Sequence, residues 1–155
     1  MTQKDKDLLL KDLCARLPYG VKAYVRNWSK LDRKYYEGTY TVASIHPSLN
    51  TILAYSERSS VEVIVGYDDH EIKPYLFPMS SMTPEQENEW NDLFHNPLDE
   101  LFTKDKNGGI ERNEKLLLIS KSMLDPIQWC YKNNFDILGF IPMGLAIDAT
   151  GLNIY

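Results

Sequence analysis

The sequence predicts an α+β domain in which a small antiparallel sheet packs against helices near both ends of the chain. Residues 4–17 show helical spacing, residues 21–67 hold several short stretches rich in β-forming residues, and residues 84–95 and 125–134 carry helix start signals. Short turns separate the β-rich stretches, and this favours antiparallel pairing because parallel strands need long crossover connections. We therefore expect three to four strands within residues 21–67.

The first helix is predicted from apolar residues that recur every three or four positions. These residues are Leu9, Leu10, Leu13, Cys14 and Leu17. The charged residues between them, including Lys11, Asp12 and Arg16, are expected on its polar face. Pro18 and Gly20 follow the last apolar residue and are expected to end the helix.

From residue 21 the pattern changes to the two-residue period of a strand, with Val21, Ala23 and Val25 on one face. The opposite face then carries alternating basic and aromatic side chains. These are Lys22, Tyr24, Arg26 and Trp28. Further strands are expected in residues 38–45, 51–55 and 61–67, with a hairpin turn through Pro47 and Asn50 between the first two.

The later helices are predicted from their start signals. Thr83 is a suitable N-cap, Pro84 suits the first helical position, and Gln86 completes a capping-box pattern. Pro126 similarly suits the start of a short helix that Asn133 and its neighbour end. The expected core contains apolar residues from every one of these elements. They are Leu10, Leu13, Leu17, Val21, Val25, Val63, Val65, Trp90, Leu93, Phe94, Ile127 and Cys130.

Composition indicates one globular domain over residues 1–155. Apolar residues make up 43% and charged residues 25% of the chain, which is ordinary for a globular protein. No apolar run is long enough for a membrane span, and the first residues do not form a secretory signal. The two cysteines sit in apolar segments without metal-ligand spacing and are expected to be reduced. These features favour a cytoplasmic protein without a cofactor.

The best functional lead is the basic and aromatic alternation that begins on the first strand. Although the whole chain carries a net charge of −5, its first 36 residues carry an excess of five positive charges. The basic residues continue beyond the strand with Lys30, Arg33 and Lys34. Rings and cations together are typical of single-stranded nucleic-acid binding, but the same residues also suit a protein-binding face or the plain solvent face of a sheet.

Two other segments offer candidate sites. Pro74 and Pro78 hold residues 72–83 extended, so Tyr75 and Phe77 could add an apolar strip to a partner's groove or sheet, or could close the end of this domain's own core. The densest polar cluster could ligate a hard divalent cation. Its members are Asp68, Asp69, His70 and Glu71. Because these residues are consecutive, alternate side chains on a strand would point apart, which makes a solvated connection the simpler interpretation.

The stretches IKPYLFPMSSMT (72–83) and FDILGFIPMGLAID (135–148) resemble a group of small uncharacterised proteins from gut Bacteroidetes and their prophages and mobile elements. Phe77 stands where that group often carries a charged residue. The resemblance implies a bacterial or phage origin inside the cell, and it supplies no activity, cofactor or catalytic residue.

No catalytic pair, nucleophile motif or phosphate loop is evident in the sequence. The prediction is therefore a non-enzymatic accessory protein, of phage or mobile-element origin, that binds a protein, either itself or another. One alternative is a single-stranded nucleic-acid-binding protein that uses residues 22–36. The other is a metal-dependent hydrolase or nuclease that uses residues 68–73.

Overall fold

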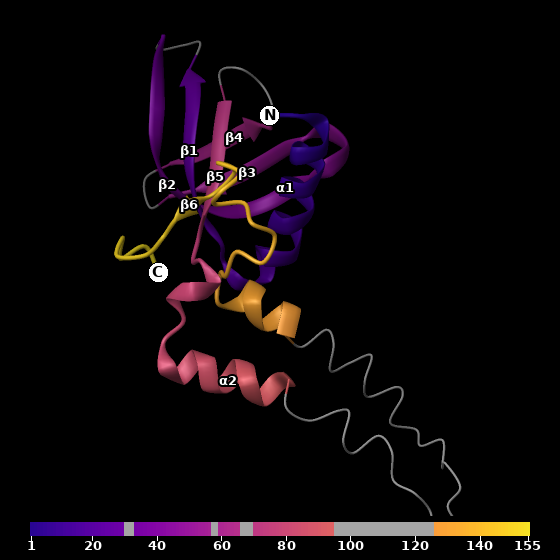
Figure 1. Cartoon of the computed structure of the whole chain (residues 1–155). Coiled ribbons are helices and arrows are strands. Elements are labelled where there is room, and N and C mark those ends of the chain that lie inside the picture. Colours follow the sequence, from indigo (N-terminus) through magenta and orange to yellow (C-terminus); the bar gives the residue numbers. More distant parts are fainter. Residues whose placement is uncertain (30–32, 57–58, 66–69, 95–125) are drawn as a thin grey trace, which may run out of the picture.

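The computed structural model describes residues 1–29, 33–56, 59–65, 70–94 and 126–155 (Figure 1). Two helices are long, and residues 126–132 form a further short helix. The long helices are α1 (Gln3–Arg16) and α2 (Pro84–Phe94). The strands are β1 (Lys22–Ser29), β2 (Lys34–His46), β3 (Thr51–Tyr55), β4 (Ser60–Ile64), β5 (His70–Leu76) and β6 (Ile147–Asp148). Helices and strands are both present, so the α+β class is confirmed.

The sheet is larger than the sequence predicts. Within the described residues it has six strands, in the order β4-β3-β2-β1-β5-β6, instead of the expected three or four. The first five strands pair antiparallel, and β6 pairs parallel to β5 through Tyr75 and Leu76. β5 contains Pro74, in a segment for which the sequence predicts no strand. Proline has no N–H to donate, but a strand tolerates it where that side of the strand is an edge. β6 has two residues, too few for a periodic signal.

The sheet bends because β2 is long and serves two neighbours. Its first part pairs with β1, its last part pairs with β3, and a bulge lies between Val42 and Ser44. Bulges increase local bend and twist. The bend brings β4 back toward β1 and β5, where the Asn27 side-chain amide donates to the Glu62 carbonyl oxygen (3.3 Å) and the Ile64 N–H donates to His70 Nδ1 (3.0 Å).

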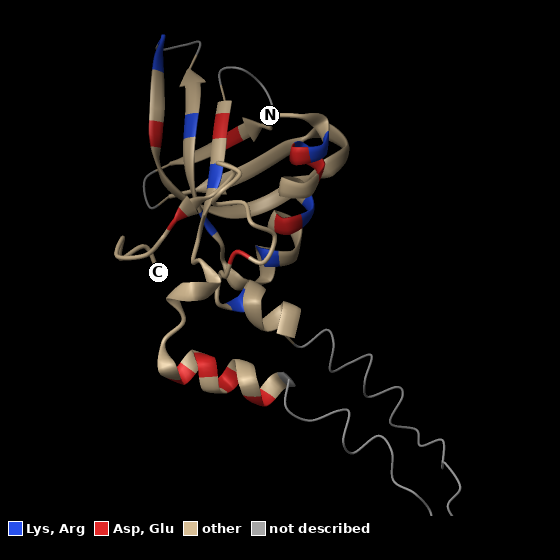
Figure 2. Ribbon diagram, viewed as in Figure 1, with Lys and Arg blue, Asp and Glu red and all other residues tan. Residues whose placement is uncertain are grey.

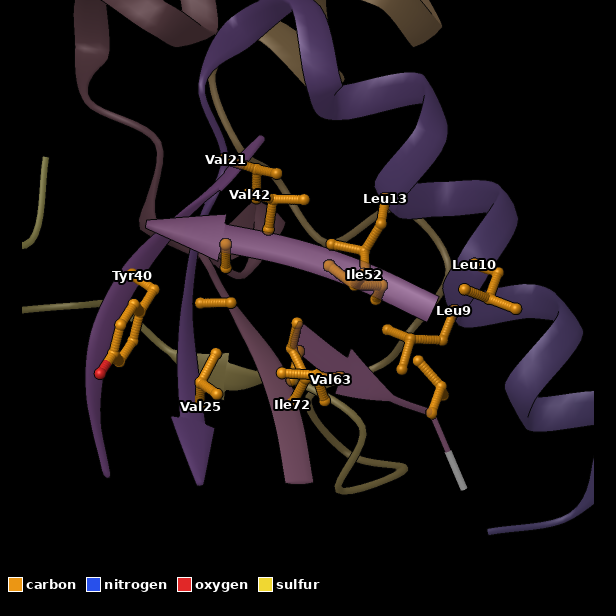
Figure 3. Packing of buried hydrophobic residues seen from close by; sticks show 14 of the residues in the cluster. Leu9, Leu10, Leu13, Val21, Val25, Tyr40, Val42, Ile52, Val63 and Ile72 are labelled. Carbon is orange, nitrogen blue, oxygen red and sulfur yellow. The ribbon is translucent and has the colours of Figure 1, made fainter. Parts of the chain in front are cut away.

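The hydrophobic core fills the concave side of this bent sheet, which we call the inner face. Helix α1 lies against it and contributes Leu9, Leu10 and Leu13 (Figure 3). The facing strand residues are fully buried, as at Val25 and Ile52. Seven of the predicted core residues are confirmed as buried. They are Leu10, Leu13, Val21, Val25, Val63, Val65 and Cys130.

Local start and stop signals of the helices are confirmed. At α2, the Thr83 N–H donates to the Gln86 Oε1 (2.9 Å) and the Gln86 N–H donates to the Thr83 Oγ1 (3.3 Å), which is the predicted capping box. Gly20 ends the first helical region in the left-handed conformation (φ 70°). Asn50 adopts the same conformation (φ 54°) at the predicted hairpin turn. A side chain with a Cβ is strained there, and Gly and Asn tolerate it best.

The polar face predicted for the first helix is partly wrong, because Asp12 and Arg16 are buried. Their side chains are 0% exposed and form an ion pair with 2.7 Å between Arg16 Nε and Asp12 Oδ2. Arg16 Nη2 also donates to the Phe135 carbonyl oxygen (2.8 Å), and its guanidinium lies 4.9 Å from the ring centroid of Tyr131. Burial raises the pKa of the Asp12 carboxyl, although the neighbouring guanidinium opposes that shift. The pair therefore ties α1 to the C-terminal part of the chain.

The C-terminal segment is an integral layer of the domain. Phe135 and Phe140 are 1% and 0% exposed, and Asp136 accepts hydrogen bonds from the N–H groups of Phe140 and Ile141, both at 2.8 Å. The short helix at 126–132 buries Cys130, but the prediction that Ile127 joins the core is wrong, since it is 44% exposed. Its buried positions are Pro126 and Cys130, one helical turn apart, so Ile127 faces away from them.

Candidate interaction face and arm

The face of the sheet opposite the core, which we call the outer face, carries the basic and aromatic side chains of β1. Val21, Ala23 and Val25 are all 0% exposed, which places the residues between them on the outer face. Lys22, Tyr24, Arg26 and Trp28 are half-buried there. The predicted alternation of β1 is therefore present, and the remaining question is what each outer residue contacts.

One end of the outer face is covered by the chain's own C-terminus. The Lys22 ammonium donates to the Ile154 carbonyl oxygen (2.5 Å) and lies 5.7 Å from the ring centroid of Tyr155. The Tyr155 hydroxyl donates to the Tyr75 carbonyl oxygen (2.8 Å), and its burial raises the pKa of Tyr155 to about 12. Lys22 therefore binds the C-terminus of its own chain. The remaining candidate residues on β1 are Tyr24, Arg26 and Trp28.

Beyond Asn27, which pairs with His70 at the end of β5, β1 continues with β2 as its described strand partner. We call the outer end of the β1–β2 hairpin, residues 26–29 and 33–38, the arm; at its base Arg26 and Asn27 still pair with β5. In Figure 1 the arm projects past the rest of the sheet. Residues 33–37 are exposed, so this part of the hairpin presents side chains on both of its faces.

The outer face of the arm holds a packed cluster of Arg26, Trp28 and Tyr35, which we call the ring cluster. The Arg26 guanidinium carbon lies 3.9 Å from the Tyr35 ring centroid, within cation–π range. The Trp28 and Tyr35 ring centroids are 4.9 Å apart in an edge-to-face arrangement. Tyr35 is 41% exposed. The cluster is thus held in place by its own contacts while it remains open to solvent.

Acidic side chains flank the cation of the ring cluster on both neighbouring strands. Arg26 stands opposite Glu37 of β2 and opposite Glu71 of β5. The Tyr24 hydroxyl donates to Glu37 Oε2 (2.7 Å), and Lys73 forms an ion pair with Glu71 (2.8 Å). Directly opposite residues share one face of a sheet. The described part of the outer face therefore carries a mixture of both charges.

The basic residues that follow β1 in sequence do not all join this face. Lys34 pairs with Ser29, which places it on the inner side of the arm, where its ammonium lies 4.7 Å from the Tyr36 ring centroid. Arg33 is exposed at the arm tip, and Lys30 lies outside the described residues. Figure 2 shows cations at the arm tip and carboxylates along α2 at the other end of the molecule.

Tyr75 and Phe77 both contact other parts of the same chain. Tyr75 is 7% exposed within β5, and its hydroxyl lies 3.3 Å from Thr39 Oγ1. Phe77 forms a bridge with Phe135, and its ring centroid lies 5.9 Å from that of Tyr155. Tyr75 is therefore buried on the outer face of the sheet, and Phe77 is half-buried against the C-terminal part of the chain.

The acidic cluster does not converge within the described residues. His70 accepts the Ile64 N–H on the inner side, whereas Glu71 pairs with Lys73 on the outer side. Asp68 and Asp69 lie outside the described residues. In the part of the chain that the structure describes, no group of three or more His, Cys, Asp or Glu side chains could hold a metal ion.

Glu37 could not be assigned to the site from the sequence, and Tyr35 is included only as part of the segment 22–36, without its contacts to Arg26 and Trp28. Their places opposite Arg26 and Trp28 depend on the register of the β1–β2 hairpin. That register depends on the geometry of the turn, and a one-residue slip would exchange the two faces of β2. The only available signal was the run of charged and aromatic residues itself.

Comparison with known proteins adds no family to this description. No protein-family model, curated protein or solved structure matches the chain. Among the described helices, none combines the length and the apolar character that crossing a membrane requires.

The bond between Tyr24 and Glu37 leads to a titration prediction. The pKa of Tyr24 is raised to about 12, chiefly by its hydrogen bond to the Glu37 carboxylate. We expect Tyr24 to keep its proton at a pH where an ordinary tyrosine with a pKa near 10 has ionised. Glu37→Gln should bring the pKa of Tyr24 back toward 10. Carbon-13 resonances of labelled tyrosine measure this, with Tyr24→Phe for assignment, and an unchanged Tyr24 titration in Glu37→Gln would contradict it.

The two cysteines differ in access, which gives a second prediction. Both are free thiols, and burial raises the pKa of Cys130 to about 11 and that of Cys14 in the same direction. Cys14 lines a surface hollow of about 300 Å³ between α1 and Pro47, whereas Cys130 is 0% exposed. A thiol reagent should therefore modify Cys14 in the folded protein and Cys130 only after unfolding. Mass spectrometry of the labelled peptides checks the order, and early labelling of Cys130 would contradict it.

Proposed function

We propose that this protein is a non-enzymatic binding module and that the arm is the surface through which it binds another protein. The observation that carries the proposal is the ring cluster of Arg26, Trp28 and Tyr35. Arg, Trp and Tyr are the residue types that dominate binding energy in protein interfaces. Their mutual contacts at 3.9 Å and 4.9 Å order the side chains before a partner arrives, which lowers the entropy lost on binding.

Charge balance favours a protein over a nucleic acid as the partner. A phosphate that approached Arg26 would also approach Glu37 and Glu71, the residues opposite it on both neighbouring strands. The carboxylates of Glu37 and Glu71 would repel the negative charge of the phosphate. A protein surface, in contrast, can present groups of both signs. Exposed apolar side chains also lie on β3, which pairs with β2 from Thr41 onward; Leu53 and Tyr55 are 41% and 51% exposed.

Single-stranded nucleic acid is the second candidate, supported by the rings and by the cations at the arm tip. Arg33 and Lys34 are exposed there, beside Tyr35 and Tyr36. A nucleic-acid-binding arm predicts tight binding of single-stranded oligonucleotides with a steep dependence on salt, and a loss of about 1–3 kcal/mol for each stacked ring removed. The protein-binding proposal predicts weak oligonucleotide binding that is the same for the parent and for Trp28→Ala with Tyr35→Ala.

Quantitative affinity capture tests the protein-binding proposal. We expect Arg26→Ala and Tyr35→Ala each to lose about 2 kcal/mol or more of binding free energy toward the captured protein. Leu49→Ala and Ile127→Ala are matched controls, because these side chains are 68% and 44% exposed and lie outside the arm. Equal capture by the parent, the arm variants and the controls would refute the proposal.

A further inference from the structure

The arm has one side along which β2 has no described strand beside it. Between Lys34 and Tyr40, β2 pairs with β1 alone, and its pairing with β3 begins at Thr41. Figure 1 shows this part of β2 as the outermost strand of the arm. We call residues 37–39 of β2 the open edge. An edge of this kind presents main-chain donors and acceptors to a further strand.

The direction of those main-chain groups follows from a hydrogen bond at the base of the hairpin. The Val42 N–H donates to the Val21 carbonyl oxygen (3.0 Å), so even-numbered residues of β2 direct their main-chain groups toward β1. Because the direction alternates along an antiparallel strand, Glu37 and Thr39 direct theirs away from β1. Both residues are exposed. The main-chain groups of Glu37 and Thr39, on either side of Gly38, are thus available for pairing.

Gly38 stands between these two residues, and the fold itself does not require a glycine there. A Cβ at Gly38 would meet only the Tyr40 ring, at an ordinary 3.6 Å, and its φ lies outside the left-handed range. Glycine within a strand often marks a place where another backbone approaches closely. A strand added beside β2 could place a large side chain over Gly38, a packing that stabilises glycines at sheet edges.

We infer that the open edge binds an extended segment of the partner protein as an added antiparallel strand, with acidic residues of that segment next to the arm tip. Main-chain bonds at Glu37 and Thr39 supply affinity, and the alternate side chains of the segment supply specificity. At the arm tip the described cations are Arg33 and Lys34, both exposed, whereas Glu37 lies farther from the tip and already accepts the Tyr24 hydroxyl. This charge favours carboxylates in the segment. The inference rests on the proposed function and names its partner class.

The probe is a displayed library of random linear peptides selected on the full-length protein. We expect selected peptides to slow hydrogen exchange at the Glu37 and Thr39 amides of the parent protein. Selected peptides that protect other amides, or a library that yields no binder, would overturn the inference. So would amides already protected in a dimer of doubled mass without peptide, because the occupant would then be a second copy of the chain.

A matched pair of variants isolates the main-chain bond. Glu37→Pro and Glu37→Ala both lose the bond to Tyr24, but only Glu37→Pro lacks the outward N–H. Glu37→Pro should bind the selected peptides about tenfold more weakly than Glu37→Ala, because it loses one main-chain hydrogen bond. Lys34→Glu should also lower the affinity for these peptides. Equal affinity for the proline and alanine variants would contradict strand addition. If Glu37→Pro does not fold, the exchange measurement on the parent decides the inference.

The two proposals can fail separately. Protein capture that depends on Arg26 and Tyr35 without any protection at Glu37 and Thr39 would keep the protein-binding arm and remove the added strand. Protection of those two amides together with capture that is insensitive to Arg26 and Tyr35 would move the binding site from the ring cluster to the edge alone.

Discussion

Arg16→Met is expected to lower the free energy of unfolding by about 3–5 kcal/mol. The substitution removes the partner of Asp12, and both side chains of the ion pair are 0% exposed. Asp12 would then hold a buried carboxylate without its cation, and the Phe135 carbonyl oxygen would lose the donor that now lies 2.8 Å away. Urea unfolding followed by circular dichroism measures the loss.

A double variant distinguishes an unpaired charge from lost packing. Asp12→Leu combined with Arg16→Met removes both charges and introduces apolar side chains of similar size. Such replacements of buried ion pairs are often neutral or stabilising. We expect the double variant to be clearly more stable than Arg16→Met alone. A double variant as unstable as the single one, or a loss below about 1 kcal/mol for Arg16→Met, would contradict the role given to the pair.

Phe140→Ala is expected to cost about 3–5 kcal/mol, the usual range for removing a fully buried phenylalanine. Phe140 is 0% exposed and belongs to the same core cluster as the α1 leucines, although it lies far along the chain. Leu138→Ala is the matched control, because Leu138 belongs to the same segment and is 42% exposed. It should change stability by no more than about 0.5 kcal/mol. Similar small effects of both variants would show that the C-terminal segment is not part of the cooperative core.

Elements with local signals could be predicted from the sequence. The α1 periodicity, the capping box at Thr83 and the left-handed Asn50 all depend on neighbours within a few positions, and the structure contains each of them. The alternation of β1 likewise assigned Val25 to the core and Arg26 to the opposite face, since a strand has a fixed period of two.

Features that depend on distant contacts could not be predicted. Asp12 and Arg16 have the spacing of a surface pair, and only the return of residues 131–136 over the helix makes them buried. Their positions one turn from Leu9 and Leu13 placed them beside the apolar stripe, but a single sequence does not show what covers it. The curl of the sheet depends on the bulge between Val42 and Ser44, and the site depends on the hairpin register that brings Glu37 opposite Arg26.

The origin and cellular location implied by the sequence remain predictions. The same is true of the partner, because the arm shows a surface and not its occupant. A probe placed on the arm and read out in the cells that make the protein addresses the partner directly, since it reports whatever molecule touches the ring cluster.

Site-specific photocrosslinking from position 35 tests the protein-binding arm most directly. With p-azidophenylalanine in place of Tyr35, illumination should give a heavier species that protease removes and nuclease leaves intact. The same group in place of Leu49, which is 68% exposed outside the arm, should give no such species. An adduct that nuclease removes, or equal adducts from positions 35 and 49, would contradict the account.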